Sequence, residues 1–108
     1  MEYYVKENQL LIQFHGELGS LEVWETREKV VALIEQKRPE TVILDLEDVK
    51  YLDSSSIGFI LARYKQLYQM GSKLQICGIH PHVSKILEIS GIYQLVTCVN
   101  SKKKEEVR

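Results

Sequence analysis

The spacing of hydrophobic and polar residues along the chain alternates between strand-like and helix-like segments. Near the N-terminus two short runs rich in β-formers, Tyr3 to Lys6 and Gln9 to His15, flank the dipeptide Glu7-Asn8. This pattern predicts an opening β-hairpin. The segment Gly16 to Gly19 interrupts the pattern, so the second strand is expected to end there.

A helix is predicted from Ser20 to about Lys37. Ser20 is a suitable N-cap, and Glu22 places a negative charge in the first turn, where the helix dipole favours it. The residues expected to form its buried stripe are Val23, Trp24, Val30, Val31 and Ile34. Pro39 ends this helix, because proline cannot donate the next backbone hydrogen bond.

The segment Thr41 to Leu46 is almost continuously apolar and rich in β-branched residues. Such runs are typical of strands that are buried on both faces of a parallel sheet. We therefore expect Thr41 to Leu46 to be the central strand, followed by a loop from Glu47 to Asp53.

The clearest helical period in the chain follows this loop. Its apolar residues recur at the i, i+3, i+4, i+7 spacing of one helical face: Ile57, Ile60, Leu61, Tyr64, Leu67 and Tyr68. Such spacing predicts an amphipathic helix with this face on the core. Gly71 ends it.

The remaining elements continue the alternation. Lys73 to Ile79 is predicted to be a strand, a helix begins at Pro81 and ends before Gly91, and Gln94 to Val99 is a last strand. Helices that alternate with strands require crossover connections and a largely parallel sheet. The chain is therefore predicted to be a single α/β domain over residues 1–100, with a charged tail at residues 101–108 to which no chemistry is assigned.

Composition narrows the possible functions. Fourteen Lys and Arg against fifteen Asp and Glu give a net charge of −1, without the basic stripe that nucleic-acid binding needs. No apolar run approaches the roughly 20 residues that span a bilayer, and the N-terminus lacks the pattern of a signal peptide. We expect a cytoplasmic protein that binds neither nucleic acid nor membrane, in which Cys77 and Cys98 are free thiols packed in the core.

Enzymatic motifs are also missing from the sequence. His80-Pro81-His82 supplies two imidazoles without a third ligand at metal-binding spacing. The glycines do not form a phosphate-binding loop, and no Gly-x-Ser-x-Gly motif is present. Trp24 and the six tyrosines are expected to pack in or against the core rather than to stack on a ligand. These observations predict a protein without catalytic activity, cofactor or metal.

The segment Leu52-Asp53-Ser54-Ser55-Ser56-Ile57-Gly58 joins the region of the central strand to the strongest helix. In open α/β sheets, functional sites collect at this edge. One serine is enough for an N-cap, and the start of a helix also tolerates a phosphate, because its free amides favour negative charge. The pattern alone leaves both interpretations open, a helix cap or a phosphorylated serine.

This segment resembles the anti-sigma factor antagonist family, whose fold is called the STAS domain. The similarity is carried by Leu44 to Gly58 and by Arg63-Tyr64-Lys65-Gln66, and it continues in Gly16-Glu17-Leu18 and Ile89-Ser90-Gly91-Ile92. It covers essentially Leu10 to Val96 and is strongest toward the sporulation members of the family. The resemblance implies a mixed, largely parallel sheet with an N-terminal hairpin and packed helices.

The resemblance also implies a partner switch. The unmodified protein would bind an anti-sigma factor that is also a serine kinase, and so release a sigma factor. Phosphorylation would reverse the binding, and a metal-dependent serine phosphatase would restore it; ATP belongs to the kinase. The acceptor of the family corresponds to Ser54.

Two positions depart from the family pattern. Ser56 stands where the family usually has glycine, which could stiffen the loop or offer a competing acceptor, and Gly19 stands where aspartate is common. The residues expected on the docking surface are Asp53, Ser55, Ser56, Glu17 and Ser20, with Gly19 at its border. Arg63 and Lys65 lie off the predicted apolar stripe, and either partner contact or simple solvation fits them.

Another function fits the same fold. A STAS module can also serve as a scaffold or bind a small ligand or lipid without any phosphorylation cycle. A stress-response antagonist, rather than a sporulation one, would use the same switch.

Overall fold

The computed structural model describes residues 1–100, apart from the side chains of Glu17 and Ser20. The predicted charged tail at residues 101–108 lies outside the described residues. The elements in chain order are β1 (Glu2–Lys6), β2 (Gln9–Leu18), α1 (Ser20–Lys37), β3 (Thr41–Leu52), α2 (Ser54–Gln69), β4 (Lys73–Cys77), α3 (Pro81–Ile89), the 3₁₀ turn η1 (Ile92–Gln94) and β5 (Thr97–Cys98).

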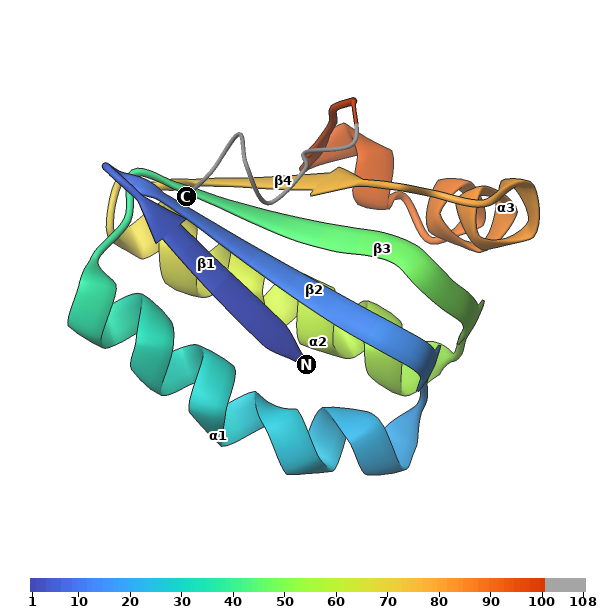
Figure 1. The fold of residues 1–108 in the computed structure, drawn as a ribbon. Helices are drawn as coiled ribbons and strands as arrows, with labels where there is room; N and C mark the ends of the chain where they lie inside the picture. The colour runs from blue at the N-terminus through green and yellow to red at the C-terminus, as the bar shows by residue number, and fades with distance from the viewer. Residues whose placement is uncertain (101–108) are drawn as a thin grey trace.

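The strands form one sheet in the order β1-β2-β3-β4-β5 (Figure 1). β1 and β2 form the predicted antiparallel hairpin, and every other neighbouring pair is parallel. α1 and α2 lie along one face of the sheet, and α3 lies beyond the carboxyl end of β4. This arrangement confirms the predicted α/β class and the mixed, largely parallel sheet.

The main core lies between the sheet and the two long helices. On β2, Leu10, Ile12 and Phe14 point to this side, whereas Leu11 belongs to a second cluster with Ile43 and Cys77 on the opposite face. Both faces of the central strands are thus buried, as the continuous apolar run of β3 predicts.

Two strands continue further than predicted. β2 runs on to Leu18 rather than ending at Gly16, and β3 reaches Leu52 through the segment expected to be a loop. The extensions pair with each other, Leu18 opposite Leu52, after two register shifts at which β3 advances one residue more than β2. The polar residues of this stretch hid the strand from the pattern, because only Val49 and Leu52 of residues 47–52 are buried. Both helices therefore begin directly at strand ends.

The end of the domain is less regular than predicted. Gln94 to Val99 is not one strand but includes the end of η1 and the two-residue strand β5. Cys98 on β5 is exposed rather than packed in the core, whereas Cys77 is buried as expected.

Several aromatic and charged side chains also differ from the prediction. Trp24 is 80% exposed and Tyr68 71% exposed, so neither belongs to the buried face of its helix. The buried face of α2 instead includes Phe59 and Arg63. No helix among residues 1–100 combines the length and the hydropathy needed to cross a membrane.

Candidate functional site at the start of the two long helices

The ends of β2 and β3 bring the first turns of α1 and α2 to one edge of the sheet. Leu18 and Leu52 are opposite each other in the parallel pair, and each is followed by a one-residue step into a helix. Since the free amides of a helix N-terminus carry partial positive charge, two such ends side by side favour negatively charged groups. The site is built on this edge.

Asp53 is the N-cap of α2. One carboxylate oxygen accepts hydrogen bonds from the backbone amides of Ser55 (2.9 Å) and Ser56 (3.1 Å). A cap of this kind stabilises a helix by about 1 kcal/mol. The half-buried carboxylate is therefore committed to holding the first turn, while its second oxygen faces Gly19.

Ser56 is fully buried and links three segments. Its hydroxyl accepts from the amide of Asp53 (3.1 Å), which completes a capping box, and it donates to the carbonyl of Leu18 at the end of β2. This geometry corrects the expectation that Ser56 is part of the docking surface. The serine that replaces the usual glycine ties α2 to β2 and is inaccessible as an acceptor.

Ser54, in contrast, is exposed at the first position of α2. Its hydroxyl has no hydrogen bond to any described side chain or backbone group, and the capping role belongs to Asp53. Ser55, the next residue, is half-buried. Among the three consecutive serines, Ser54 is thus the one whose hydroxyl stands in solvent.

Gly19 faces the same cap from the neighbouring helix. A Cβ atom at Gly19 would lie 3.3 Å from Oδ2 of Asp53 and 3.4 Å from Oε1 of Glu22. The Glu22 oxygen accepts the amide of Gly19 (2.9 Å) and so caps α1. The N-cap of α1 is therefore Gly19 and not Ser20, which the sequence predicted. This places Glu22 three residues after the cap, where a glutamate completes a capping box, and adds it to the site.

Two predicted site residues can be placed only by their backbone. Glu17 pairs with Tyr51 near the end of β2, and Ser20 is the first residue of α1. Their side chains lie outside the described part of the chain. Both backbone positions lie at the same sheet edge as Asp53.

Arg63 is buried rather than solvated, which corrects one of the two interpretations left open for it. Its guanidinium carbon lies 5.3 Å from the centre of the Phe59 ring, and within residues 1–100 neither Nε nor Nη1 has a hydrogen-bond partner. Burial, with the nearby charge of Arg27, lowers the pKa of Arg63. Lys65 is exposed, so the two basic residues of the motif have different environments.

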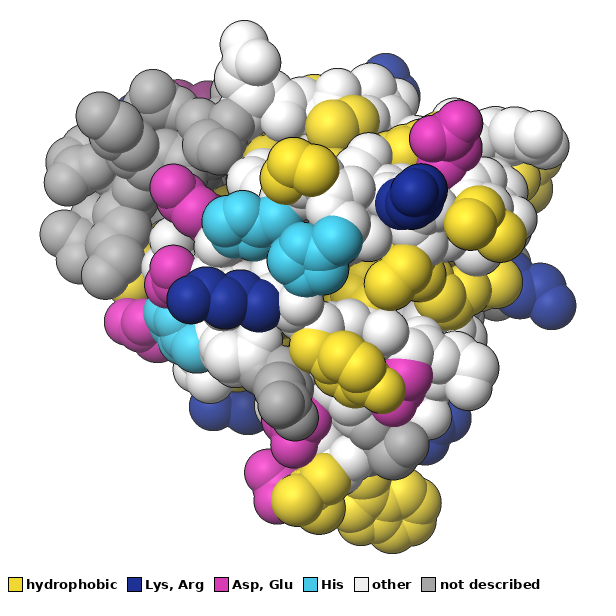
Figure 2. Space-filling view, turned by 90° about the vertical axis from the view of Figure 1, so that its right-hand side faces the viewer, with side chains coloured by type: hydrophobic (Ala, Val, Ile, Leu, Met, Phe, Trp, Pro, Cys, Tyr) yellow, Lys and Arg dark blue, Asp and Glu magenta, His cyan; other side chains and the backbone are white. Residues whose placement is uncertain are grey.

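Exposed hydrophobic side chains surround the edge. Tyr51 is 47% exposed, and its ring lies 3.6 Å from the Cβ position of Gly19; Leu21 and Trp24 on the first turns of α1 are more exposed still. Figure 2 shows this side of the molecule, where several separate yellow hydrophobic groups lie among magenta carboxylates, dark-blue basic groups and cyan histidines. Apolar side chains rimmed by polar ones are typical of protein interaction surfaces.

The two histidines next to Pro81 are hydrogen-bonded to backbone carbonyls of β3. Nε2 of His80 is hydrogen-bonded to the carbonyl of Glu47, and Nε2 of His82 to the carbonyl of Lys50. Both carbonyls belong to the part of β3 that extends beyond β4. Within residues 1–100, no group of three His, Cys, Asp or Glu side chains is arranged to hold a metal ion.

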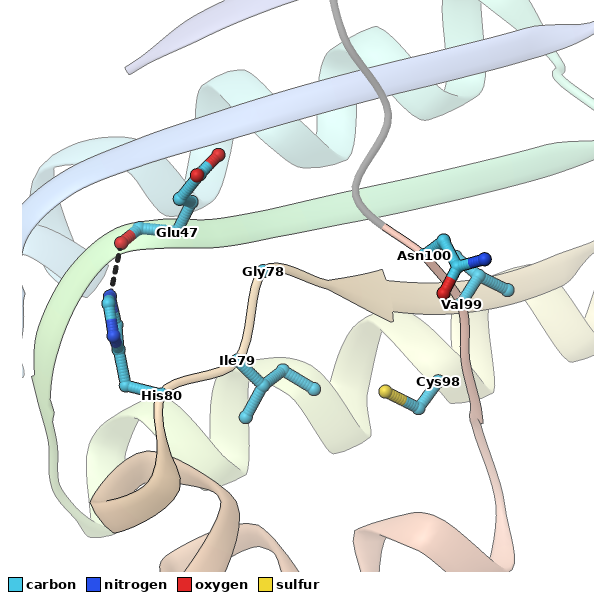
Figure 3. A pocket seen from close by; sticks show the side chains of 7 residues that line it. All are labelled: Glu47, Gly78, Ile79, His80, Cys98, Val99 and Asn100. Atoms are coloured by element: carbon cyan, nitrogen blue, oxygen red, sulfur yellow. Dashed lines mark hydrogen bonds between the residues drawn. The ribbon is translucent and has the colours of Figure 1, made fainter.

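A hollow of about 350 Å³ lies beside His80, between the middle of β3 and the residues that follow β4 and β5 (Figure 3). Its lining residues are Glu47, Gly78, Ile79, His80, Cys98, Val99 and Asn100. Gly78 has a positive φ, and a Cβ there would lie 2.7 Å from the amide nitrogen of Glu47. Only glycine fits this turn, so the close approach to β3 explains why residue 78 is a glycine, and no ligand is needed to explain it.

Comparison with known proteins establishes the class. The STAS domain family matches residues 1–105, and the chain belongs to this family. An anti-sigma F factor antagonist of Paenibacillus polymyxa is 30% identical over 87 residues, which cover 81% of this chain and 74% of that protein. An anti-sigma-B factor antagonist of Staphylococcus aureus is 29% identical over 85 residues, or 79% of this chain and 78% of that one.

Solved structures agree on the fold. The Bacillus cell fate determinant SpoIIAA in its phosphorylated form superposes with a TM-score of 0.72 at 22% identity, covering 96% of this chain and 95% of that one. At this level of identity the likeness concerns the fold. It matches the domain implied by the resemblance of the Leu44–Gly58 segment.

Proposed function

We propose that this protein is an anti-sigma factor antagonist that is switched off by phosphorylation of Ser54. In the unphosphorylated form it binds an anti-sigma factor that is a serine kinase, and the sigma factor is released. A serine phosphatase restores the active form, and the cycle operates in the cytoplasm. The two relatives named as antagonists of anti-sigma factors support the first part of the proposal.

The observation that supports the switch is that Asp53 and Ser56 cap α2, whereas Ser54 makes none of the capping bonds. Asp53 and Ser56 hold the first turn of α2 by hydrogen bonds to each other's backbone, and Ser54 takes no part in it. A phosphoryl group on Ser54 therefore meets solvent instead of the interior. Adding it requires no capping bond to break.

Electrostatics favours a phosphate that stays on the surface. The amides of Ser55 and Ser56 already donate to Asp53, so a phosphate on Ser54 cannot claim them without displacing a carboxylate. It would add a charge of roughly −1.5 to −2 beside Asp53. The expected effect is a large change in the surface potential at the docking edge, with the fold retained.

The partner surface is proposed to surround Ser54. It includes the accessible parts of Asp53 and Ser55, the first turn of α1 with Glu22, and the exposed ring of Tyr51. Glu17 and Ser20 remain proposed members on the position of their backbone. Ser56 is excluded because it is buried.

The test is intact-mass and peptide-mapping analysis after incubation with the host's anti-sigma kinase and ATP. We expect one phosphate on the peptide that contains Ser54 and none on Ser54→Ala. Ser90→Ala, which removes an exposed serine at the end of α3 outside the proposed partner surface, is the matched control and should be labelled like the unaltered chain. Stoichiometric labelling of Ser54→Ala would show that the acceptor is another residue.

Binding separates the switch from the acceptor. Ser54→Ala should bind the anti-sigma factor as the unmodified chain does, whereas Ser54→Asp should bind at least about tenfold more weakly, a loss of about 1.4 kcal/mol in binding free energy. Titration calorimetry measures both. If Ser54→Asp bound with undiminished affinity, added charge would not be the reason for release, and a STAS scaffold or ligand-binding module without a switch would be favoured.

A further inference from the structure

The outer edge of β1 has no partner strand among residues 1–100. β1 is the first strand in the sheet order, and its neighbour among the strands of residues 1–100 is β2. Two of its side chains, Tyr3 and Val5, remain 40% and 41% exposed. An edge strand presents a row of unpaired amides and carbonyls, which is a template for another strand.

The sequence of β1 is complementary to itself. When two copies of Glu2-Tyr3-Tyr4-Val5-Lys6 run antiparallel about Tyr4, each Glu2 lies opposite Lys6, and each Tyr3 lies opposite Val5. Opposite charges and aromatic–β-branched pairs are both favourable across antiparallel strands. The two Tyr4 residues meet at the twofold axis.

The backbone fits the same register. Along an edge strand, alternate residues direct both amide and carbonyl outward. In the register centred on Tyr4 an odd-numbered residue always faces an odd-numbered one, and an even-numbered residue an even-numbered one. Whichever set points outward, its groups therefore meet groups that also point outward, and the hydrogen-bond ladder closes.

The carboxylate of Glu2 is already held in position. One of its oxygens accepts from the hydroxyl of Tyr4 (3.0 Å), and the other is 2.8 Å from Nε2 of His15 on β2. Lys6, at the other end of the strand, is exposed. In the dimer, Lys6 of each copy would thus lie opposite the Glu2 carboxylate of the other copy, which Tyr4 and His15 of that same copy hold in position.

Tyr3 and Val5 would gain contact at the same time. Their neighbours on β2 are Ile12 and Leu10, which belong to the main core, so both side chains lie at the open margin of that core. Pairing of two copies places four such side chains together. Apolar surface buried in this way adds to the backbone hydrogen bonds.

We propose that β1 is a self-association edge, through which two copies of this chain form one continuous sheet across a twofold axis. Charged residues at strand ends usually discourage edge pairing. Here Glu2 and Lys6 discourage pairing with the edge strands of other proteins, but in a second copy of this chain each lies opposite a residue of opposite charge. The proposal is independent of the switch, because Ser54 follows β3, two strands away from β1 in the sheet.

Sedimentation velocity tests this proposal on the full chain from about 10 μM to about 1 mM, the range in which a small interface associates. The sedimentation coefficient is expected to rise from monomer to dimer with concentration. Lys6→Glu places glutamates opposite each other and should weaken association about tenfold or more. Lys29→Glu, an exposed charge reversal on α1, is the matched control and should leave association unchanged.

Mixing decides between a specific edge and general charge effects. Glu2→Lys and Lys6→Glu should each be monomeric alone, yet an equimolar mixture should dimerise, because every pair across the edge is then attractive. Circular dichroism checks that Glu2→Lys keeps its fold without the contact to His15. A monomeric wild type at the highest concentration, or a mixture that stays monomeric, would overturn the proposal.

Discussion

At the scale of single residues, the site depends on which serine does which task. The sequence showed three adjacent serines, and only burial and hydrogen bonding distinguish them: Ser54 is exposed, Ser55 is half-buried and Ser56 is buried. A pattern of residue types cannot assign these roles, because hydroxyl groups of the same kind serve as cap, tether or acceptor. The motif predicted a site at the turn between β3 and α2, and the structure places an exposed serine, Ser54, there.

Ser56 provides a prediction about stability. Ser56→Ala leaves the amide of Asp53 and the carbonyl of Leu18 without this partner, so the free energy of unfolding should fall by about 1–3 kcal/mol. Urea denaturation followed by circular dichroism measures the change. Ser54→Ala, the exposed neighbour, should stay within about 0.5 kcal/mol of the unaltered chain.

Equal losses in Ser54→Ala and Ser56→Ala would contradict the roles assigned to them. Ser56→Gly, which restores the residue more usual in the family, should also be less stable, because glycine supplies no hydroxyl and adds backbone freedom. The difference in the free energy of unfolding between Ser56→Gly and the unaltered chain therefore tests the expectation that Ser56 stiffens this loop.

At the scale of the elements, local periodicity predicted which segments are helices and strands but misjudged where strands stop. β3 was expected to end near Leu46 because polar residues follow, yet pairing with β2 carries it to Leu52. Its last residues form a strand through hydrogen bonds to a neighbour distant in sequence. Such tertiary pairing overrides local propensity.

The same limit applies to the faces of the helices. Trp24 is exposed because the first turns of α1 lie at the sheet edge, where less of the helix is covered, and Arg63 is buried where α1 and α2 pack together. Hydrophobicity alone assigned them to the opposite environments. Their positions depend on how the helices are placed, which single-chain periodicity does not contain.

Arg63 gives the prediction at this scale. A buried cation with unsatisfied donors pays desolvation without full compensation, so Arg63→Met should be as stable as the unaltered chain or more so. Because burial lowers the pKa of Arg63, the charged form is disfavoured in the folded state, and stability should rise only as pH climbs through the folded-state pKa toward the higher pKa of an exposed arginine. No change from this group is expected between about pH 5 and 9.

The control for Arg63 is Lys65 on the same helix. Lys65→Met removes an exposed charge and should change the free energy of unfolding by no more than about 0.5 kcal/mol. Urea denaturation at neutral pH compares both variants. A loss of more than about 2 kcal/mol in Arg63→Met would show that the guanidinium is paired and stabilising.

At the scale of the whole molecule, the buried core is distinct from the apolar side chains that remain exposed. The core is enclosed by the sheet and the two long helices, while Leu21, Trp24 and Tyr51 are exposed near the edge where α1 and α2 begin. The fold class followed from the sequence, whereas the place of the site stays a prediction. The composition of the surface did not follow from the sequence, since it depends on which side chains the assembled sheet leaves uncovered.

Trp24 supplies the prediction at this scale, because it is the only tryptophan and is 80% exposed. Its emission maximum should already be that of a solvated indole and should shift little on global unfolding, while circular dichroism reports the full transition. Binding of the anti-sigma factor should shift the emission to the blue if the first helix is part of the interface. A large red shift on unfolding would mean that Trp24 is buried in solution.

The bonds from His80 and His82 to β3 have a consequence for how this domain can vary. β3 extends beyond the end of β4, and the two imidazoles are hydrogen-bonded to carbonyls of this extension that would otherwise be available to another strand. The connection between β4 and α3 is only three residues long, Gly78 to His80. A longer connection would let His80 and His82 move away from the carbonyls of Glu47 and Lys50. Those carbonyls would then be free to pair with a strand of another molecule, so an insertion here is expected to promote aggregation.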